Sequence, residues 1–303
     1  MDIYINQNLD HYAISKIPEV NTEHIRNKIL NVPYADQSSS QKLDIYLPDT
    51  KGPFPVIVSI HGGAFMGGDK ADVQLIPMLE GLKKGYAVVS INYRLSHQAV
   101  FPALIYDGKA AIRWIRANSE KYGFNPDRIA AWGGSAGGYL SSFLGVSAGV
   151  EELEDLSMGN DDYSSNIQAA VVWFGPTNFL LMDQQLEESG LLAEKGKRHS
   201  EINSPESLFL GEKITNIPGL VKKANPETYI TENTPLFLLQ HGTKDSTVPV
   251  QQSIEFAEKL KKELGSEKIT LDLLEGAEHA DQAFETEENL EIVFNFLDRV
   301  LKS

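Results

Sequence analysis

The stretch that decides the fold is Ile129-Ala130-Ala131-Trp132-Gly133-Gly134-Ser135-Ala136-Gly137-Gly138-Tyr139. Its first four residues are apolar, which is typical of a short buried strand, and its end continues into a run compatible with a helix. Gly133-x-Ser135-x-Gly137 thus lies between a strand and a helix, the context of a nucleophile elbow. In so sharp a turn the serine backbone is strained, and side chains at the glycine positions would collide with neighbouring backbone. We predict that Ser135 presents its hydroxyl above a helix N-terminus, which favours negative charge.

The composition is that of an acidic globular protein. The chain has 303 residues, of which 42% are hydrophobic, and a formal net charge of -15. This length allows one large α/β domain. The negative charge argues against binding to nucleic acid or to an anionic membrane surface, because both require basic patches. We find neither a signal sequence after Met1 nor an apolar run as long as a membrane span, so we expect a cytoplasmic location.

Cysteine and the common cofactor motifs are absent from the sequence. The lack of cysteine excludes disulfides, thiolate catalysis and zinc–thiolate sites. The metalloprotease motif H-E-x-x-H, the phosphate-binding loop and the dinucleotide motif G-x-G-x-x-G are missing. Asp161-Asp162 is interpreted as part of a solvated loop. We therefore expect no metal site and no cofactor.

Predicted strands and helices alternate along most of the chain. Strands are expected at residues 25–32, 42–47, 55–61, 86–93, 129–132, 168–174, 235–241 and 268–274, and helices at 73–84, 103–122, 250–264, 284–301 and directly after Ser135. Such alternation predicts β-α-β units, and therefore a mostly parallel sheet with helices on both faces. The strand at 42–47 alternates in polarity, which predicts that one of its faces is exposed.

We expect a single α/β domain over residues 1–303 with two additions. Residues 1–24 are polar with scattered apolar side chains, which predicts an N-terminal arm or short helix. Residues 176–233 are rich in Glu, Lys, Asn and Pro and are too long for a plain connection in a compact domain. We interpret them as a cap inserted over the catalytic face; the alternative is a loose surface excursion.

A glycine pair follows the strand at 55–61, in the sequence His-Gly-Gly-Ala-Phe at 61–65. Glycines leave backbone N–H groups unshielded, so that a ligand oxygen can approach them closely. The N–H groups of Gly62, Gly63 and Ala64, together with that of Ala136 after the serine, are predicted to hold the oxyanion of a tetrahedral intermediate.

Two further strand ends carry a candidate acid and a candidate base. Asp245 follows the strand at 235–241, where its carboxylate can orient an imidazole and stabilise the imidazolium; capping of the next helix is the alternative role. His279 follows the last strand and lies downstream of both Ser135 and Asp245, so we predict that it is the general base. The remaining histidines are His11, His24, His61, His97, His199 and His241. Of these, His61 is expected to bind its own loop.

These motifs resemble the α/β-hydrolase superfamily, and within it the HGG-loop serine esterases and lipases related to hormone-sensitive-lipase-like and feruloyl- and acetylxylan-esterase-like bacterial carboxylesterases. Besides the three motifs above, the matching pieces are Asn92-Tyr93-Arg94-Leu95, Phe101-Pro102-Ala103 with Asp107, Asn125-Pro126-Asp127-Arg128-Ile129, His241-Gly242-Thr243-Lys244-Asp245 and Val248-Pro249. The resemblance implies an α/β-hydrolase fold and the same roles for Ser135, Asp245 and His279. Ala64 stands where many relatives have a third glycine, which leaves open which N–H groups of the loop face the oxyanion.

We therefore expect a serine carboxylesterase that hydrolyses short-acyl esters through an acyl-enzyme. Acetyl esters on saccharides are suggested only by family analogy. An amide hydrolase of formamidase or peptidase type would use the same three residues, whereas a non-catalytic binding protein on this scaffold would normally lack one of them. The expected partner is a small ester or acylated saccharide, and a homodimer is one of the open oligomeric states.

Overall fold

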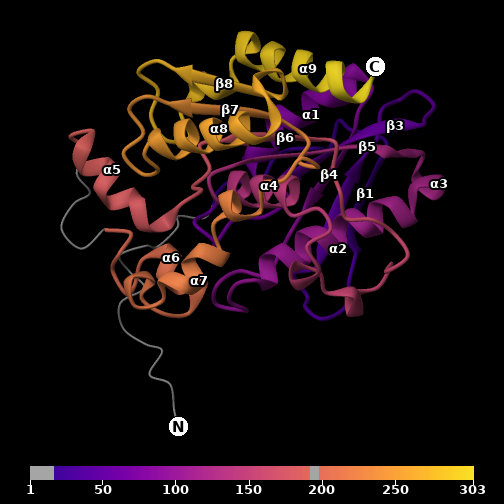
Figure 1. Cartoon of the computed structure of the whole chain (residues 1–303). Helices are drawn as coiled ribbons and strands as arrows, with labels where there is room; N and C mark the ends of the chain where they lie inside the picture. Colours follow the sequence, from indigo (N-terminus) through magenta and orange to yellow (C-terminus); the bar gives the residue numbers. More distant parts are fainter. Residues whose placement is uncertain (1–16, 192–197) are drawn as a thin grey trace.

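The computed structural model describes residues 17–191 and 198–303, which form a sheet of eight strands covered by helices (Figure 1). The strand order is β1-β2-β4-β3-β5-β6-β7-β8. β2 runs antiparallel to β1 and β4, and all other neighbouring strands are parallel. The predicted mostly parallel α/β sheet is confirmed. Most of the predicted N-terminal arm, residues 1–16, lies outside the described residues.

The strands are β1 (Lys28–Pro33), β2 (Lys42–Tyr46), β3 (Phe54–Ile60), β4 (Ala87–Ile91), β5 (Phe124–Gly134), β6 (Ala169–Trp173), β7 (Leu236–Gly242) and β8 (Ile269–Leu274). The α-helices are α1 (Ile76–Leu79), α2 (Ala103–Ala117), α3 (Ser119–Tyr122), α4 (Ala136–Val146), α5 (Met182–Glu188), α6 (Pro205–Leu210), α7 (Pro218–Lys223), α8 (Gln251–Leu264) and α9 (Glu287–Leu301).

Helices lie on both faces of the sheet. Side chains of α2, α4 and α8 share one hydrophobic cluster, and those of α1 and α9 share a second cluster. In the ribbon view, α1 and α9 lie on the other side of the sheet from α2 and α4 (Figure 1). The prediction that one face of the strand at 42–47 is exposed was wrong. Asp44 and Tyr46 are both buried, because Tyr46 packs in the second cluster and the Asp44 carboxylate pairs with Lys70 at 3.1 Å.

Three predicted helices also differ from the structure, and the strands predicted at 25–32 and 129–132 are Lys28–Pro33 and Phe124–Gly134. The helix expected at 73–84 is three short segments, because Pro77 has no N–H and fits only the first turn of α1. The helix expected at 103–122 is divided at Asn118, whose side chain donates to the Trp114 carbonyl and ends α2. The last helix begins only at Glu287, where the Thr286 hydroxyl caps its N-terminus.

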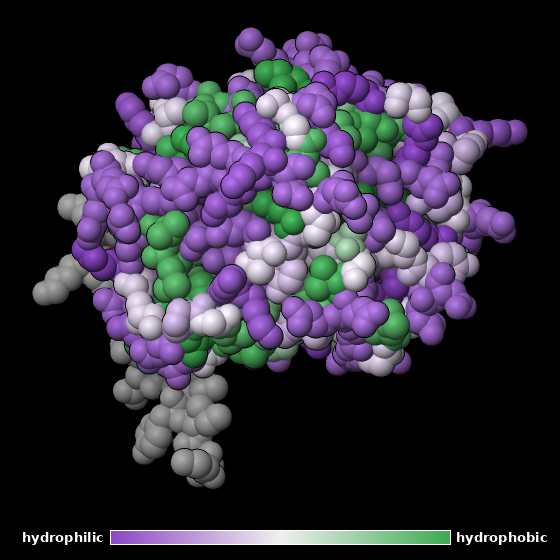
Figure 2. Space-filling model, in the orientation of Figure 1, coloured by the Kyte–Doolittle hydropathy of each residue, from purple (hydrophilic) through white to green (hydrophobic). Residues whose placement is uncertain are grey.

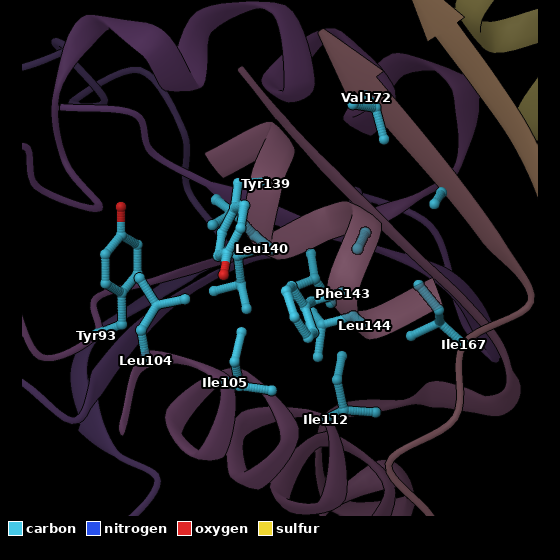
Figure 3. Close-up of a cluster of buried hydrophobic side chains, with 14 of the residues drawn as sticks. Tyr93, Leu104, Ile105, Ile112, Tyr139, Leu140, Phe143, Leu144, Ile167 and Val172 are labelled. Atoms are coloured by element: carbon cyan, nitrogen blue, oxygen red, sulfur yellow. The ribbon is translucent and has the colours of Figure 1, made fainter. Parts of the chain in front are cut away.

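Helix α4, which begins directly after Ser135, is held by an apolar face. Leu140, Phe143 and Leu144 of α4 lie in the same cluster as Leu104, Ile105 and Ile112 of α2 (Figure 3). Tyr139 is also buried, and its hydroxyl donates to the Ala224 carbonyl oxygen at 2.6 Å. Full burial of such a side chain contributes about 1.5–3 kcal/mol, so the N-terminus of α4 is fixed by a large part of the core.

Residues 176–191 and 198–233 contain α5, α6 and α7 and the short 3₁₀ turns Phe179–Leu181, Ile214–Asn216 and Pro226–Tyr229. Several of their apolar side chains are buried, whereas Leu180 and Ile202 are exposed. Phe179, Met182, Phe209, Leu210, Ile214 and Val221 are buried in the cluster that contains α4. The described part of this segment is therefore packed against the body of the domain.

The surface agrees with the acidic composition. The face shown in Figure 2 is mainly hydrophilic, and its hydrophobic side chains are spread over small patches. Each helix in the described ranges is too short or too polar to span a lipid bilayer.

The end of β5 approaches β3 so closely that a side chain does not fit between them. A Cβ atom on Gly133 would lie 2.6 Å from the Ile60 carbonyl oxygen, and one on Gly137 would collide with the same oxygen. By contrast, Gly219 in α7 faces open space.

We predict that Gly133→Ala lowers the free energy of unfolding by about 3 kcal/mol or abolishes soluble expression, because the backbones must move apart. The matched control Gly219→Ala should leave stability unchanged or raise it by up to about 1 kcal/mol. Urea unfolding of both variants tests this, and equal stability of Gly133→Ala and the parent would contradict the packing argument.

Candidate active site

Ser135 occupies the strained turn between β5 and α4. Its backbone has φ 56° and ψ −122°, a conformation that non-glycine residues rarely adopt and that costs about 1–3 kcal/mol. Two backbone hydrogen bonds hold the turn: the Ser135 N–H donates to the Trp173 carbonyl at 3.0 Å, and the Tyr139 N–H donates to the Ser135 carbonyl at 2.9 Å. The surrounding sheet and helix therefore maintain the strain that the sequence predicted.

Three side chains from separate strand ends meet at this turn. His279 Nε2 lies 3.0 Å from Ser135 Oγ, and His279 Nδ1 lies 2.7 Å from Asp245 Oδ2. Because a carboxylate only accepts, the proton of the neutral imidazole is on Nδ1, and Nε2 is free to accept from the serine hydroxyl. The arrangement can remove a proton from Ser135 and stabilise the resulting imidazolium.

Asp245 is fully buried but well supplied with donors. Its Oδ1 accepts from the N–H groups of Thr247 and Val248, each at 2.8 Å. Burial raises the pKa of Asp245, but hydrogen bonds from His241 and His279 outweigh this effect and bring the pKa well below its usual range. The carboxylate is therefore ionised at neutral pH. Asp245 orders its own loop and orients His279 at the same time.

The ring of His279 is fixed from one side by aromatic contacts. Phe174 lies edge-on to it, with ring centroids 4.7 Å apart, and Phe284 contacts Phe174 at the same centroid distance. The His279 side chain keeps 19% of its surface exposed. It can thus exchange protons with solvent while its orientation is restrained.

The loop after β3 has an unusual backbone conformation. Gly63, Ala64 and Phe65 all have positive φ, at 121°, 52° and 63°. Among the described residues, the N–H groups of Gly63, Ala64 and Ala136 have no hydrogen-bond partner. These three groups can receive a developing oxyanion.

Gly62 differs from the other predicted oxyanion donors. Its N–H already donates to Gln74 Oε1 at 2.9 Å, so it is not available to a substrate oxygen in this structure. Gln74 is in turn held by Asp72, which accepts from both the backbone and the side-chain nitrogen of Gln74. Our reasoning from the sequence missed Gln74, because a lone glutamine 12 residues after a glycine loop carries no motif.

His61 binds its own loop, as expected. Its Nδ1 lies 2.8 Å from the Gly62 carbonyl oxygen, and its ring stacks on Tyr93 with centroids 4.4 Å apart. Burial lowers the pKa of His61, so the ring is neutral and serves to shape the loop.

A small cavity of about 50 Å³ lies beside the elbow. Gly134, Gln74, Phe174 and Ala280 are among its lining residues. A single water molecule needs about 10–15 Å³ of such volume, so the cavity can hold a few water molecules or a small group. In the described part of the chain, no three His, Asp or Glu side chains are arranged to hold a metal ion, and Asp161 and Asp162 are exposed as expected.

Comparison with known proteins identifies the family to which the chain belongs. Residues 43–260 match the BD-FAE family model. The chain belongs to the BD-FAE family. It is 31% identical over 278 residues to the probable carboxylic ester hydrolase LipM of Mycobacterium tuberculosis, covering 87% of this chain and 61% of LipM. The chain therefore spans less than two thirds of the length of this curated relative.

Solved structures of similar proteins show the same α/β-hydrolase fold. A truncated carbohydrate esterase from gut microbiota superimposes with a TM-score of 0.82 at 30% identity, covering 95% of this chain and 100% of that one. A bifunctional GH43-CE protein of Bacteroides eggerthii gives a TM-score of 0.79 at 35% identity, covering 90% of this chain and 38% of that one. The α/β-hydrolase fold expected for this BD-FAE member is thereby confirmed.

We predict that Gln74→Leu lowers kcat about ten- to a hundredfold, because the loop that carries the Gly63 and Ala64 N–H groups loses the acceptor that holds it. Urea unfolding of the same variant separates this effect from a loss of stability. A Gln74→Leu enzyme with normal stability and normal kcat would show that the contact with Gly62 does not position the loop.

Proposed function

We propose that the chain is a serine carboxylesterase that hydrolyses short-acyl esters, with acetyl esters on saccharides as its preferred substrates. The observation that carries the proposal is the unbroken series of hydrogen bonds from Ser135 Oγ through His279 to Asp245 Oδ2. The carboxylic ester hydrolase and the carbohydrate esterase among its relatives support the ester and saccharide parts of the proposal.

The reaction follows from the position of each group. Ser135 Oγ attacks the ester carbonyl carbon while its proton passes to His279 Nε2. The carbonyl oxygen becomes an oxyanion that the N–H groups of Gly63, Ala64 and Ala136 stabilise. Collapse of this intermediate breaks the bond to the alkoxy oxygen, which leaves as an alcohol with the proton from His279. Water then attacks the acyl carbon while His279 takes a proton from it. The bond from the acyl carbon to Ser135 Oγ breaks, His279 returns the proton to Oγ, and the carboxylic acid is released.

Aromatic packing next to the oxyanion loop supports a short acyl group. Phe65 directly follows Ala64 and stacks on Phe209 with ring centroids 4.4 Å apart. Tyr139, one helical turn after Ser135, contacts Phe65 edge-on at 5.2 Å and stacks on Phe179 at 5.3 Å. These buried rings fill the space beside the loop, from which we infer a site for a short acyl group.

We also propose that residues 176–233 act as a cap, which contributes to the site from outside the sheet. The segment supplies Phe179 and Phe209 to the aromatic packing just described. It is also joined to the loop of Asp245, because His199 Nε2 donates to the Thr247 carbonyl oxygen at 2.9 Å.

Ser135→Ala should lower turnover of p-nitrophenyl acetate at least about 10⁴-fold, because the nucleophile is lost. His279→Gln should cause a comparable loss, whereas the matched control His97→Ala, at an exposed position, should leave turnover unchanged. Turnover by Ser135→Ala within tenfold of the parent would overturn the assignment.

The same enzyme should prefer acetate over longer acyl chains. A series of p-nitrophenyl esters from acetate to octanoate, with acetylated xylo-oligosaccharides and an acetanilide as further substrates, measures this preference. Highest kcat/KM on octanoate would contradict the short-acyl proposal, and higher kcat/KM on the anilide than on the acetate ester would favour an amide hydrolase.

The contact between the proposed cap and the Asp245 loop gives a prediction for pH. Burial lowers the pKa of His199, but Glu206, whose Oε1 is 3.0 Å from His199 Nδ1, and nearby Asp183 outweigh this and raise it to about 9. The folded-state pKa lies above the unfolded value of about 6.5. This ion pair therefore stabilises the fold fully below pH 6.5, and the contribution is lost as the pH rises through about 9.

We expect the free energy of unfolding of the parent to fall between pH 6.5 and pH 9.5 by up to about 3 kcal/mol more than that of His199→Gln. Urea unfolding of both proteins across this pH range measures the difference. Parallel pH profiles would show that His199 is not held in its charged form by Glu206 and Asp183.

A further inference from the structure

The buried side chain of His241 contacts the carboxylate that the proposed mechanism depends on. We propose that His241 is a positioning residue. It adds a fourth side chain to the hydrogen-bonded series Ser135–His279–Asp245, and its contact with Ser253 connects this series to helix α8. The inference rests on the proposed function, because it assigns a second imidazole to the same acid.

Two acceptors face one nitrogen of this ring. His241 lies in β7 and is fully buried. Its Nε2 is 2.8 Å from the Val248 carbonyl oxygen and 3.3 Å from Asp245 Oδ2. Its Nδ1 is 2.6 Å from Ser253 Oγ in α8.

The protonation of His241 follows from these neighbours. A carbonyl oxygen and a carboxylate both only accept, so Nε2 must carry a proton and share it between them. In the neutral ring Nδ1 then accepts from the Ser253 hydroxyl. That hydroxyl thus favours the tautomer that donates toward Asp245. Without it, the tautomer that donates toward Asp245 is less strongly favoured over the one whose Nε2 lone pair would face the carboxylate.

This arrangement completes the set of donors around Asp245. Oδ1 accepts from two backbone N–H groups, while Oδ2 accepts from His279 and lies within reach of His241. A buried carboxylate with donors on both oxygens cannot rotate without breaking several hydrogen bonds. His241 therefore helps to fix the plane of the Asp245 carboxylate. It contacts Oδ2, the same oxygen that accepts from His279 and orients it.

The contact of His241 with Asp245 Oδ2 also affects the general base, His279. Each donor to Oδ2 withdraws electron density from the oxygen that holds the His279 proton. If His241 is removed, Oδ2 binds the His279 imidazolium more strongly, and we expect the acid limb of kcat/KM to move to higher pH. The titratable groups that face this unit are Asp245, His279 and, through the Thr247 carbonyl, His199. Ser253, on the side of α8, is neutral.

The experiment compares the pH dependence of kcat/KM for p-nitrophenyl acetate in His241→Leu, His241→Gln and Ser253→Ala. A fluorophosphonate titration gives the active fraction of each preparation. The matched control is Ser142→Ala, because Ser142 Oγ is also buried in a helix but has no partner among the described residues.

We expect His241→Leu to lose about tenfold in kcat per active site and to show its acid limb at higher pH than the parent. His241→Gln, which keeps an N–H donor at this position, should recover part of both effects. Ser253→Ala should move the acid limb in the same direction by a smaller amount, and Ser142→Ala should match the parent.

A purely structural role predicts a different result, namely a lower active fraction with an unchanged acid limb and unchanged kcat per active site. That result in His241→Leu, or in Ser253→Ala if His241→Leu does not fold, overturns the inference. A parent enzyme that hydrolyses no ester would instead overturn the proposed function, so the two failures are distinguishable.

Discussion

The rest of the site depends on the close approach of three backbones: the end of β3, the end of β5 and the first turn of α4. The Ile60 carbonyl oxygen lies where a Cβ atom of Gly133 or Gly137 would be. This crowding forces the chain to turn within one residue, and Ser135 takes a strained conformation with positive φ as a result. The apolar face of α4 packs against α2 and holds the turn closed (Figure 3). Core packing therefore sustains the strain that exposes the serine hydroxyl.

A second constraint is the placement of one negative charge in the interior. A buried carboxylate is costly unless hydrogen bonds and opposite charge compensate it. At Asp245 that compensation comes from the adjacent backbone and from two imidazoles. The same contacts that make the burial tolerable also define the direction in which His279 points. Stability of the loop and orientation of the base are thus produced by one set of interactions.

Much of this arrangement could be predicted from the sequence, because its signals are local. The elbow glycines, the glycine pair after a core strand, and an acid and a histidine after later strands are each visible within a few residues. In a mostly parallel sheet the carboxyl ends of the strands meet at one edge. Chain order and sheet topology were therefore enough to bring Ser135, Asp245 and His279 together in prediction, and the structure places them within hydrogen-bond distance.

What the sequence did not reveal depends on contacts between distant segments. Gln74 and Ser253 are ordinary residues whose roles arise only from the groups that the fold places beside them. The burial of Asp44 and Tyr46 depends on Lys70 and on the second helix layer, which no alternation pattern within 42–47 can report. The division of the predicted helices follows from Pro77 and Asn118. The apolar periodicity of these segments predicts continuous helices and does not show the breaks that these two residues cause.

The central claim is that an oxygen developing negative charge at Ser135 is held by the N–H groups of Gly63, Ala64 and Ala136. A crystal structure of the protein inactivated by a short-chain phosphonate tests it most directly. The account predicts a bond from Ser135 Oγ to phosphorus, with the phosphoryl oxygen within hydrogen-bond distance of those three N–H groups and Gly62 still bound to Gln74. A phosphoryl oxygen turned away from this loop, or phosphorus attached to another residue, would contradict it.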